Sequence, residues 1–260
     1  MVRLSPCIEM FWRDVAFPDR IQRAASLGFN AYEFWGYDSK DLDAIERATK
    51  ETGLALSACC VNMSLAGGTI SMLQPEGSGL FADAVKDCLA VQGRLGCKSF
   101  IVTTGQELDG VPRSQQHHAC VASLKAGAPI AEDAGITLVL EPLNLLVNHK
   151  GYYLSTSAEG FGIVDEVGSP AVKLLFDVYH QQITEGNLSL NIRDNIDKIG
   201  HFHVANHPGR HELWTGEIDY NHILALIDGT DYAGYVGLEF SPSDPEQADA
   251  ILTRTLEMAP

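Results

Sequence analysis

The sequence predicts a single (β/α)₈ TIM barrel that spans residues 1–260, and three observations predict it. Short β-rich runs alternate with longer amphipathic or alanine-rich runs along the whole chain, and eight such pairs can be counted. No antiparallel hairpin signal interrupts them. A length of 260 residues is one at which an α/β barrel forms one domain. Strict alternation implies a parallel sheet and eight units close naturally into a barrel, with an open doubly wound sheet as the alternative.

The eight predicted strands are short apolar runs, as buried strands of a parallel sheet require. In chain order they are LSPCIEM at 4–10, FNAYEFW at 29–35, LALSACCV at 54–61, SFIVTT at 99–104, ITLVLE at 136–141, VKLLFD at 172–177, GHFHVA at 200–205 and YVGLEF at 235–240. Neighbouring side chains of a strand point to opposite faces, so we interpret the adjacent Cys59 and Cys60 as packing residues rather than as a reactive pair.

The predicted helices lie between and after these strands, where the runs are longer and amphipathic. They cover 18–28, 41–53, a long run near 79–95, 114–135, 155–168, a run near 187–199, 220–229 and 244–257. Several end in glycine, which favours the position after a helix, and the fifth opens on serine and threonine caps. The longest irregular segments all follow strands, so we place them on the C-terminal rim, where barrel enzymes build active sites. They are 62–78, 105–113, 142–154 and 206–218.

The composition is acidic and excludes several classes of partner. Thirty-four acidic and 18 basic residues give a formal charge of −16, which repels phosphate backbones and acidic membrane surfaces. No segment has the apolar length that a bilayer span requires, and the N-terminus lacks the pattern of a signal peptide. The six cysteines form no metal-binding or disulfide pattern. We therefore expect a soluble cytoplasmic protein with reduced, buried thiols and no nucleic-acid or membrane partner.

Four predicted strands finish with a side chain that can bind a metal ion. Side chains at the ends of neighbouring barrel strands converge on the mouth of the barrel, so we expect these four to meet. Three buried carboxylates repel one another unless a cation neutralises them. Mostly oxygen ligands with one nitrogen suit Mg²⁺ or Mn²⁺, and also Co²⁺, better than a structural zinc ion. The predicted ligands are Glu141, Asp177, His203 and Glu239.

Each of these residues has a simpler reading when it is taken alone. Asp177 reads as a helix cap, and His203 reads as a hydrogen-bonded core histidine. The coincidence of four such residues at equivalent points of consecutive strands is what favours a shared metal site. His201 lies one pleat deeper on the same strand, and we expect it to be buried or to support a ligand rather than to be one.

Several motifs resemble the hydroxypyruvate isomerase family, within a xylose-isomerase-like group of barrels that also contains ketose 3-epimerases. They are LEPLN (140–144), FDVYHQQ (176–182), HFHVANHPGRHELWTGEIDY (201–220) and GYVGLEF (234–240). The resemblance spans the whole chain and is most specific from about 133 to 242. It implies that Glu141, Asp177, His203 and Glu239 occupy the metal-binding positions, and that Glu141 and Glu239 are also the paired acid and base.

The chain departs from both branches of this group. Many hydroxypyruvate isomerases carry glutamine at the position of His203, where the epimerases carry histidine. The epimerases have a further glutamate that holds substrate hydroxyls, and the corresponding residue here is Val147. The rim loops resemble those of the isomerases, so the resemblance leaves the substrate open.

Two further residues are predicted to bind the substrate. His180 stands three residues after Asp177 on the same rim and can hydrogen-bond a substrate oxygen; the alternative is a solvated loop histidine. Arg210 follows a Pro-Gly turn, where a guanidinium can clamp the carboxylate of a 2-oxo acid. The alternative for Arg210 is a loop salt bridge with Glu212 or Glu217.

The predicted function is that of a metal-dependent isomerase. Moving a carbonyl between adjacent carbons requires proton transfer, which Glu141 and Glu239 would perform through a cis-enediolate. The predicted reaction converts hydroxypyruvate to tartronate semialdehyde, and the alternative is a D-tagatose or L-ribulose 3-epimerase-like reaction with the same metal and glutamates. A repair endonuclease would need more metal-binding histidines and a basic surface, and a sugar-binding protein would not need two glutamates at a metal. Related barrels commonly associate, which suggests a homo-oligomer.

Overall fold

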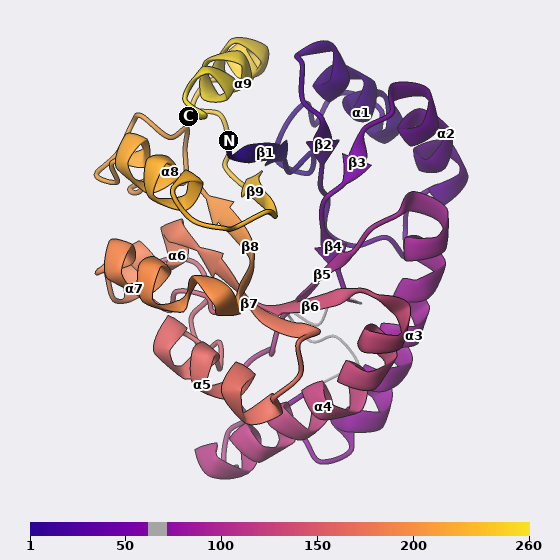
Figure 1. The fold of residues 1–260 in the computed structure, drawn as a ribbon, viewed down its shortest axis with the longest axis vertical. Helices are drawn as coiled ribbons and strands as arrows, with labels where there is room; N and C mark the ends of the chain where they lie inside the picture. Colours follow the sequence, from indigo (N-terminus) through magenta and orange to yellow (C-terminus); the bar gives the residue numbers. More distant parts are fainter. Residues whose placement is uncertain (62–71) are drawn as a thin grey trace.

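Parallel strands form the centre of the molecule and helices surround them (Figure 1). The computed structural model describes residues 1–61 and 72–260. Within these residues the strands are β1 (Arg3–Pro6), β2 (Ala31–Tyr32), β3 (Ala55–Leu56), β4 (Cys59–Cys60), β5 (Ser99–Val102), β6 (Thr137–Leu140), β7 (Val172–Asp177), β8 (Ile199–Val204) and β9 (Tyr235–Leu238). The main sheet has the order β1-β9-β8-β7-β6-β5-β4, and β2 pairs with β3. All of these pairings are parallel.

Backbone contacts beyond the paired strands close the sheet into a ring. Cys7, just after β1, forms a parallel bridge with Glu33, just after β2. On the other side of β2, the amide of Cys60 donates to the carbonyl of Trp35 at 3.1 Å. The segments around β2 and β3 therefore connect β1 to β4. The predicted barrel is confirmed, and the open sheet is excluded.

Apart from α6, the helices occupy the predicted intervals, with shifts of a few residues at their ends. They are α1 (Phe17–Ser26), α2 (Leu42–Thr52), α3 (Gly77–Leu95), α4 (Arg113–Ala134), α5 (Ser157–Val167), α6 (Val178–Thr184), α7 (Leu188–Asn195), η1 (Ile196–Lys198), α8 (Tyr220–Asp228), η2 (Pro245–Gln247) and α9 (Ala248–Glu257). Thr156 caps α5 through its side chain, as predicted. The predicted glycine ends are also present, because left-handed glycines follow four helices: Gly53, Gly96, Gly135 and Gly168.

Three details differ from the prediction. The third predicted strand, 54–61, is divided into β3 and β4, and the hydroxyl of Ser57 between them bonds the carbonyl of Tyr32 at 3.1 Å. Helix α6 was not predicted; it follows β7 directly, and Asp177 caps it by accepting from the amide of His180 at 3.1 Å. The irregular segment predicted at 62–78 lies largely outside the described residues, and its end belongs to α3.

Strand alternation divides the apolar core into two layers. The small inner cluster fills the barrel interior, and the large outer cluster lies between the sheet and the helices. Cys60 belongs to the inner cluster and Cys59 to the outer one, so the prediction for these neighbours is confirmed. All six cysteines are free and buried. The inner cluster comprises Ala58, Cys60, Ile101, Val139 and Leu175.

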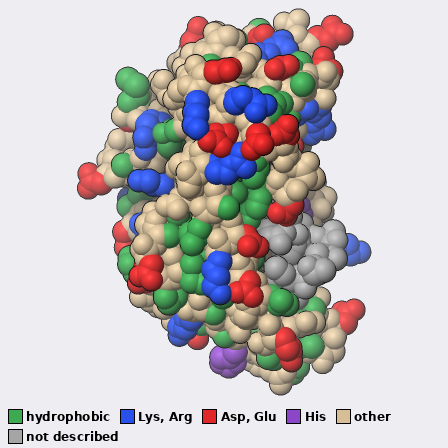
Figure 2. Space-filling view, turned by 90° about the vertical axis from the view of Figure 1, so that its right-hand side faces the viewer, with side chains coloured by type: hydrophobic (Ala, Val, Ile, Leu, Met, Phe, Trp, Pro, Cys, Tyr) green, Lys and Arg blue, Asp and Glu red, His purple; other side chains and the backbone are tan. Residues whose placement is uncertain are grey.

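The surface mixes charges of both signs. Figure 2 views the side of the molecule that carries α2 and α3, and there basic and acidic side chains stand next to one another. Arg94 of α3, for example, pairs with both Asp43 and Glu46 of α2. Within residues 1–61 and 72–260, no helix has both the length and the apolar character needed to cross a membrane.

Candidate active site

The four side chains predicted to share a metal ion converge at the mouth of the barrel. Glu141 and Glu239 directly follow β6 and β9, Asp177 ends β7, and His203 lies in β8. Alternation explains their direction: Glu141 and Asp177 lie two residues beyond the inner-layer residues Val139 and Leu175. One ligand atom from each of the four lies within 4.8 Å of the others, and all four residues are buried.

The unsatisfied atoms of this cluster fit a divalent cation. His203 Nδ1 lies 3.4 Å from Glu141 Oε1 and 3.2 Å from Glu239 Oε2. Among the described residues, neither nitrogen of the buried His203 ring makes an aligned hydrogen bond. An imidazole lone pair that faces carboxylate oxygens is repelled unless a cation or a proton lies between them. Three carboxylates and one imidazole are a donor set that suits Mg²⁺ or Mn²⁺.

The acidic groups of the cluster differ in their affinity for protons. Burial raises the pKa of Asp177 to about 7, against the opposing effect of Arg210. Burial also raises the pKa of Glu141. Burial alone would raise the pKa of Glu239 as well, but the charges of Arg210 and His203 lower it below the usual value. A bound cation would offset the cost of ionising Asp177 and Glu141 in this buried site.

Arg210 points into this cluster rather than to the surface. Its guanidinium donates to Glu239 Oε2 and lies 3.8 Å from Asp177 Oδ2. The proposed loop partners are engaged elsewhere, because Glu212 accepts from the amide of Ser243 at 3.0 Å and Glu217 from Gln182 at 3.1 Å. The salt-bridge alternative for Arg210 is therefore wrong. The backbone of Arg210 is left-handed, with φ 57°, a strained conformation that is common at functional sites.

His180 is fully buried on α6, so the alternative of a solvated loop histidine is wrong. Its Nδ1 accepts from the backbone amide of Asn144 at 3.2 Å and lies 2.6 Å from the side-chain nitrogen of Asn144. Nδ1 therefore carries a lone pair, and the proton of the neutral ring is on Nε2. Burial and the charge of Arg210 lower the pKa of His180, which keeps the ring neutral. Nε2 has no hydrogen-bond partner in the described part of the chain and lies 3.6 Å from Asp177 Oδ2.

These groups line one small cavity of about 180 Å³. Its polar walls include Glu141, Glu239 and Arg210 together with His180 and His203. Trp35, Ile101 and Leu143 form apolar walls. A cavity of this size, with both acidic and basic groups, suits a small polar molecule.

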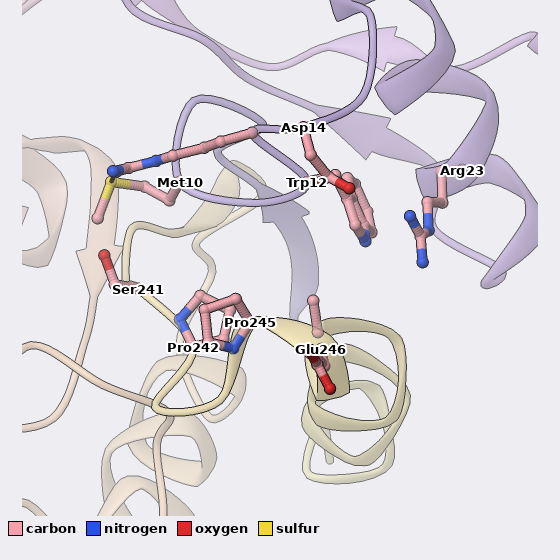
Figure 3. Close-up of a pocket in the computed structure, with 10 residues that line it drawn as sticks. Met10, Trp12, Asp14, Arg23, Ser241, Pro242, Pro245 and Glu246 are labelled. Carbon is pink, nitrogen blue, oxygen red and sulfur yellow. Dashed lines mark hydrogen bonds between the residues drawn. The ribbon is translucent and has the colours of Figure 1, made fainter.

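A second, larger pocket of about 490 Å³ lies between the segments that follow β1 and β9. In Figure 3, Trp12 and Asp14 face Pro245 and Glu246 across this pocket. Two of its polar groups are engaged, because Arg23 and the indole nitrogen of Trp12 both donate to Asp249, at 2.9 and 2.8 Å. None of the four clustered ligands lines it, so the candidate active site is the smaller cavity.

Sequence reasoning missed three residues of the site. Trp35 ends a predicted strand, and no sequence pattern marked it as a partner of Glu239, but its indole nitrogen donates to Glu239 Oε1 at 2.7 Å. His149 lines the cavity from the segment after β6, and its ring lies 5.2 Å from that of His180. Glu33 Oε1 lies 3.0 Å from Nε2 of His203. A charged residue within the apolar run AYEFW was a signal for Glu33, whereas no local pattern marks His149.

A parallel barrel that gathers two glutamates, an aspartate and a histidine at the C-terminal ends of its strands has the architecture of a barrel enzyme. The chain belongs to the xylose isomerase-like TIM barrel family, whose model matches residues 21–257.

Named relatives cover nearly the whole chain. Hydroxypyruvate isomerase of Escherichia coli is 29% identical over 251 residues, which cover 95% of this chain and 96% of that protein. A 2-oxo-tetronate isomerase of Cupriavidus necator is 30% identical and covers 93% of this chain and 94% of its own. The chain is thus an enzyme of the isomerase class.

Solved structures share the fold. One named AP endonuclease, family 2, from Brucella melitensis has a TM-score of 0.90 and 27% identity, and covers 98% of this chain and 99% of its own. A 3-keto-D-glucoside 4-epimerase from Escherichia coli has a TM-score of 0.81 at 22% identity, with 99% of this chain and 100% of that chain covered. At that identity the second comparison supports the fold alone.

Proposed function

We propose that the chain is a divalent-metal-dependent isomerase that interconverts hydroxypyruvate and tartronate semialdehyde, or a close 2-oxo acid relative. The observation that carries this proposal is the placement of Glu141 and Glu239. They come from β6 and β9, lie 3.4 and 3.2 Å from His203 Nδ1, and line the same small cavity as Arg210. The names of the relatives, hydroxypyruvate isomerase and 2-oxo-tetronate isomerase, support the substrate class.

The proposed metal ligands are Glu141, Asp177, His203 and Glu239. When bound, Mg²⁺ or Mn²⁺ would supply stabilisation of the negative charge that develops on a substrate oxygen. Trp35 holds Oε1 of Glu239 in place through its 2.7 Å hydrogen bond, which leaves the other oxygen directed at the cluster.

Glu141 and Glu239 would carry out the proton transfer. One glutamate removes a proton from C3 of hydroxypyruvate to give a cis-enediolate, and a proton is returned at C2. The hydroxyl proton at O3 is lost and one is gained at O2, so the reaction needs no external oxidant or reductant. The two carboxyl groups suit this exchange because their surroundings give them unequal pKa values.

Arg210 and His180 would hold the substrate. The guanidinium of Arg210 can pair with the substrate carboxylate once a cation takes over the neutralisation of Glu239. The Nε2–H of His180 is a buried donor without a partner among the described residues, and it is available to a carbonyl or hydroxyl oxygen. The apolar wall would keep water away from the enediolate.

A ketose 3-epimerase is the second candidate, because it would use the same ligands and glutamates. The epimerase-like His203 favours it. Against it, Val147 stands where the epimerases carry their hydroxyl-binding glutamate, and this valine is 58% exposed. The name of the Brucella relative suggests an endonuclease, but a net charge of −16 and a cluster with a single histidine oppose that reading.

Deuterium exchange in heavy water distinguishes these functions. The protein is incubated with Mn²⁺ and with hydroxypyruvate, 2-oxo-tetronate or a ketohexose, and incorporated deuterium is located by mass spectrometry and NMR. We expect deuterium at C2 of the tartronate semialdehyde, or at C2 of the 2-hydroxy-3-oxo acid formed from 2-oxo-tetronate. Exchange at C3 of the ketohexose without conversion of either 2-oxo acid would instead identify an epimerase. Binding without any exchange would identify a sugar-binding protein.

A further inference from the structure

A buried carboxylate, Glu33, lies directly behind His203 in the barrel interior. Its Oε2 is 2.9 Å from Nε2 of His201, and its Oε1 is 3.0 Å from Nε2 of His203. The three residues are each 1% exposed. Ser57 supports the carboxylate from the next strand segment, with its hydroxyl 3.3 Å from Oε2 of Glu33. Glu33 therefore faces two imidazole rings on β8 and faces away from the cavity that the substrate would occupy.

A glycine on β9 makes room for the contact between Glu33 and His203. Gly237 pairs with His203 in the sheet and lies two residues before Glu239. A Cβ atom at this position would lie 2.4 Å from Glu33 Oε1 and 2.6 Å from Cδ2 of His203. No alanine fits there unless Glu33 and His203 move. The glycine is thus required by the close approach of these two side chains.

We infer that Glu33 is a positioning residue that holds His203 with its Nδ1 directed at the metal, and that Gly237 provides the space for it. This inference rests on the proposed metal site. A carboxylate offers only acceptors, so Glu33, whose Oε1 approaches Nε2 of His203 to 3.0 Å, would take the Nε2–H of both histidines and leave the lone pair of His203 on Nδ1. That nitrogen is the one that faces Glu141 and Glu239. His201 acts on the other carboxylate oxygen and fixes the rotation of Glu33.

Glutamine at position 33 would break this arrangement while nearly preserving the volume. His201 and His203 face different oxygens of Glu33, and in glutamine one of these two atoms becomes an amide nitrogen, which donates and cannot accept. One histidine must rotate or take its proton on Nδ1, and in His203 that proton would occupy the metal-binding atom. Aspartate keeps both acceptors on a shorter side chain and should recover part of the function.

The test is a titration of metal-free protein with Mn²⁺, in which free Mn²⁺ is measured by electron paramagnetic resonance. We expect one strong site per wild-type chain. Glu33→Gln and Gly237→Ala should each weaken it by about 10- to 100-fold, the usual cost of losing a partner behind a metal ligand. Glu33→Asp should fall between glutamine and wild type. Glu212→Gln is the matched control, because it also alters a buried carboxylate, held by Ser243 instead.

Circular dichroism melting separates a loss of positioning from a loss of fold. A merely structural role would lower the melting temperature of folded Glu33→Gln and leave its Mn²⁺ affinity within about twofold of wild type, which would overturn the inference. If Glu33→Gln does not fold, the Mn²⁺ affinity and melting temperature of Gly237→Ala decide by the same criterion. A second strong Mn²⁺ site that Glu33→Gln removes would also overturn the inference, since Glu33, His201 and His203 would then bind metal themselves. No binding by wild type would instead contradict the proposed function.

Discussion

Glu141 and Glu239 carry the same side chain but meet different neighbours at the mouth of the barrel. Glu141 is buried with Nδ1 of His203 at 3.4 Å, whereas Glu239 accepts from Arg210 and from the indole of Trp35. The sequence predicted that the two would be neighbours, because each ends a strand of the same barrel. It did not reveal these partners, because they come from segments far apart in the chain.

Removing either carboxylate should stop proton transfer and preserve the fold. We expect Glu141→Gln and Glu239→Gln each to lower kcat by about 10²- to 10⁴-fold, since glutamine cannot exchange a proton. Deuterium incorporation measures the loss, and circular dichroism verifies the fold. Glu107→Gln is the control, because Glu107 is a surface residue that pairs with Arg113 at 3.1 Å. Near-full exchange in either site variant would rule out the assignment of the pair.

The pKa of Asp177 predicts how the metal-free protein responds to pH. Burial raises this pKa to about 7, above the unfolded value of about 3.9. The contribution of the protonated carboxyl to stability is therefore fully present below the unfolded value and is lost as the pH rises through about 7. Asparagine avoids the ionisation and keeps an oxygen for the amide of His180.

Melting temperatures of chelator-treated wild type and Asp177→Asn test this prediction from about pH 5 to pH 8. The melting temperature of the variant should increase relative to that of wild type as the pH rises. Saturating Mn²⁺ should make wild type the more stable protein, because asparagine is the poorer ligand. A difference that is independent of pH would contradict a raised pKa.

At the scale of elements, the strands were the easier part to predict. The apolar runs that end near a carboxylate or histidine predicted β6 to β9. They also predicted the direction of the last side chains, because alternation decides which residues face inward. Helix α6 was missed because seven residues are too few to show helical periodicity. Its presence turns His180 from a rim residue into a fully buried one. The tautomer of His180 depends on Asn144, 36 positions away, which no local pattern contains.

The segment between β8 and α8 delivers Arg210, and its predicted role is to bind a carboxylate. Lysine keeps the positive charge beside Glu239 but loses the forked pair of donors. We expect Arg210→Lys to raise KM for hydroxypyruvate by about 10- to 100-fold, the range for a lost charge-assisted hydrogen bond, with a smaller change in kcat. The affinity for Mn²⁺ should stay close to that of wild type. An unchanged KM would exclude the carboxylate role.

At the scale of the whole molecule, the ring of strands brings together residues that lie up to 232 positions apart in the sequence, such as Arg3 and Tyr235 in the pairing of β1 with β9. The eightfold alternation predicted that ring, and the acidic charge is consistent with a small-molecule substrate. Local sequence patterns did not predict how the barrel closes around β2 and β3, because this closure depends on a few hydrogen bonds between short strands. That residues 1–260 form one domain and that the chain forms a homo-oligomer stay predictions.

The central claim is that one divalent ion binds where four strands end. Anomalous diffraction from a crystal soaked in Mn²⁺ tests it most directly, because the peak marks the ion itself. The account predicts a single strong peak about 2 Å from Nδ1 of His203 and from oxygens of Glu141, Asp177 and Glu239. No peak at the mouth, or a peak between Glu33 and His201, would contradict it.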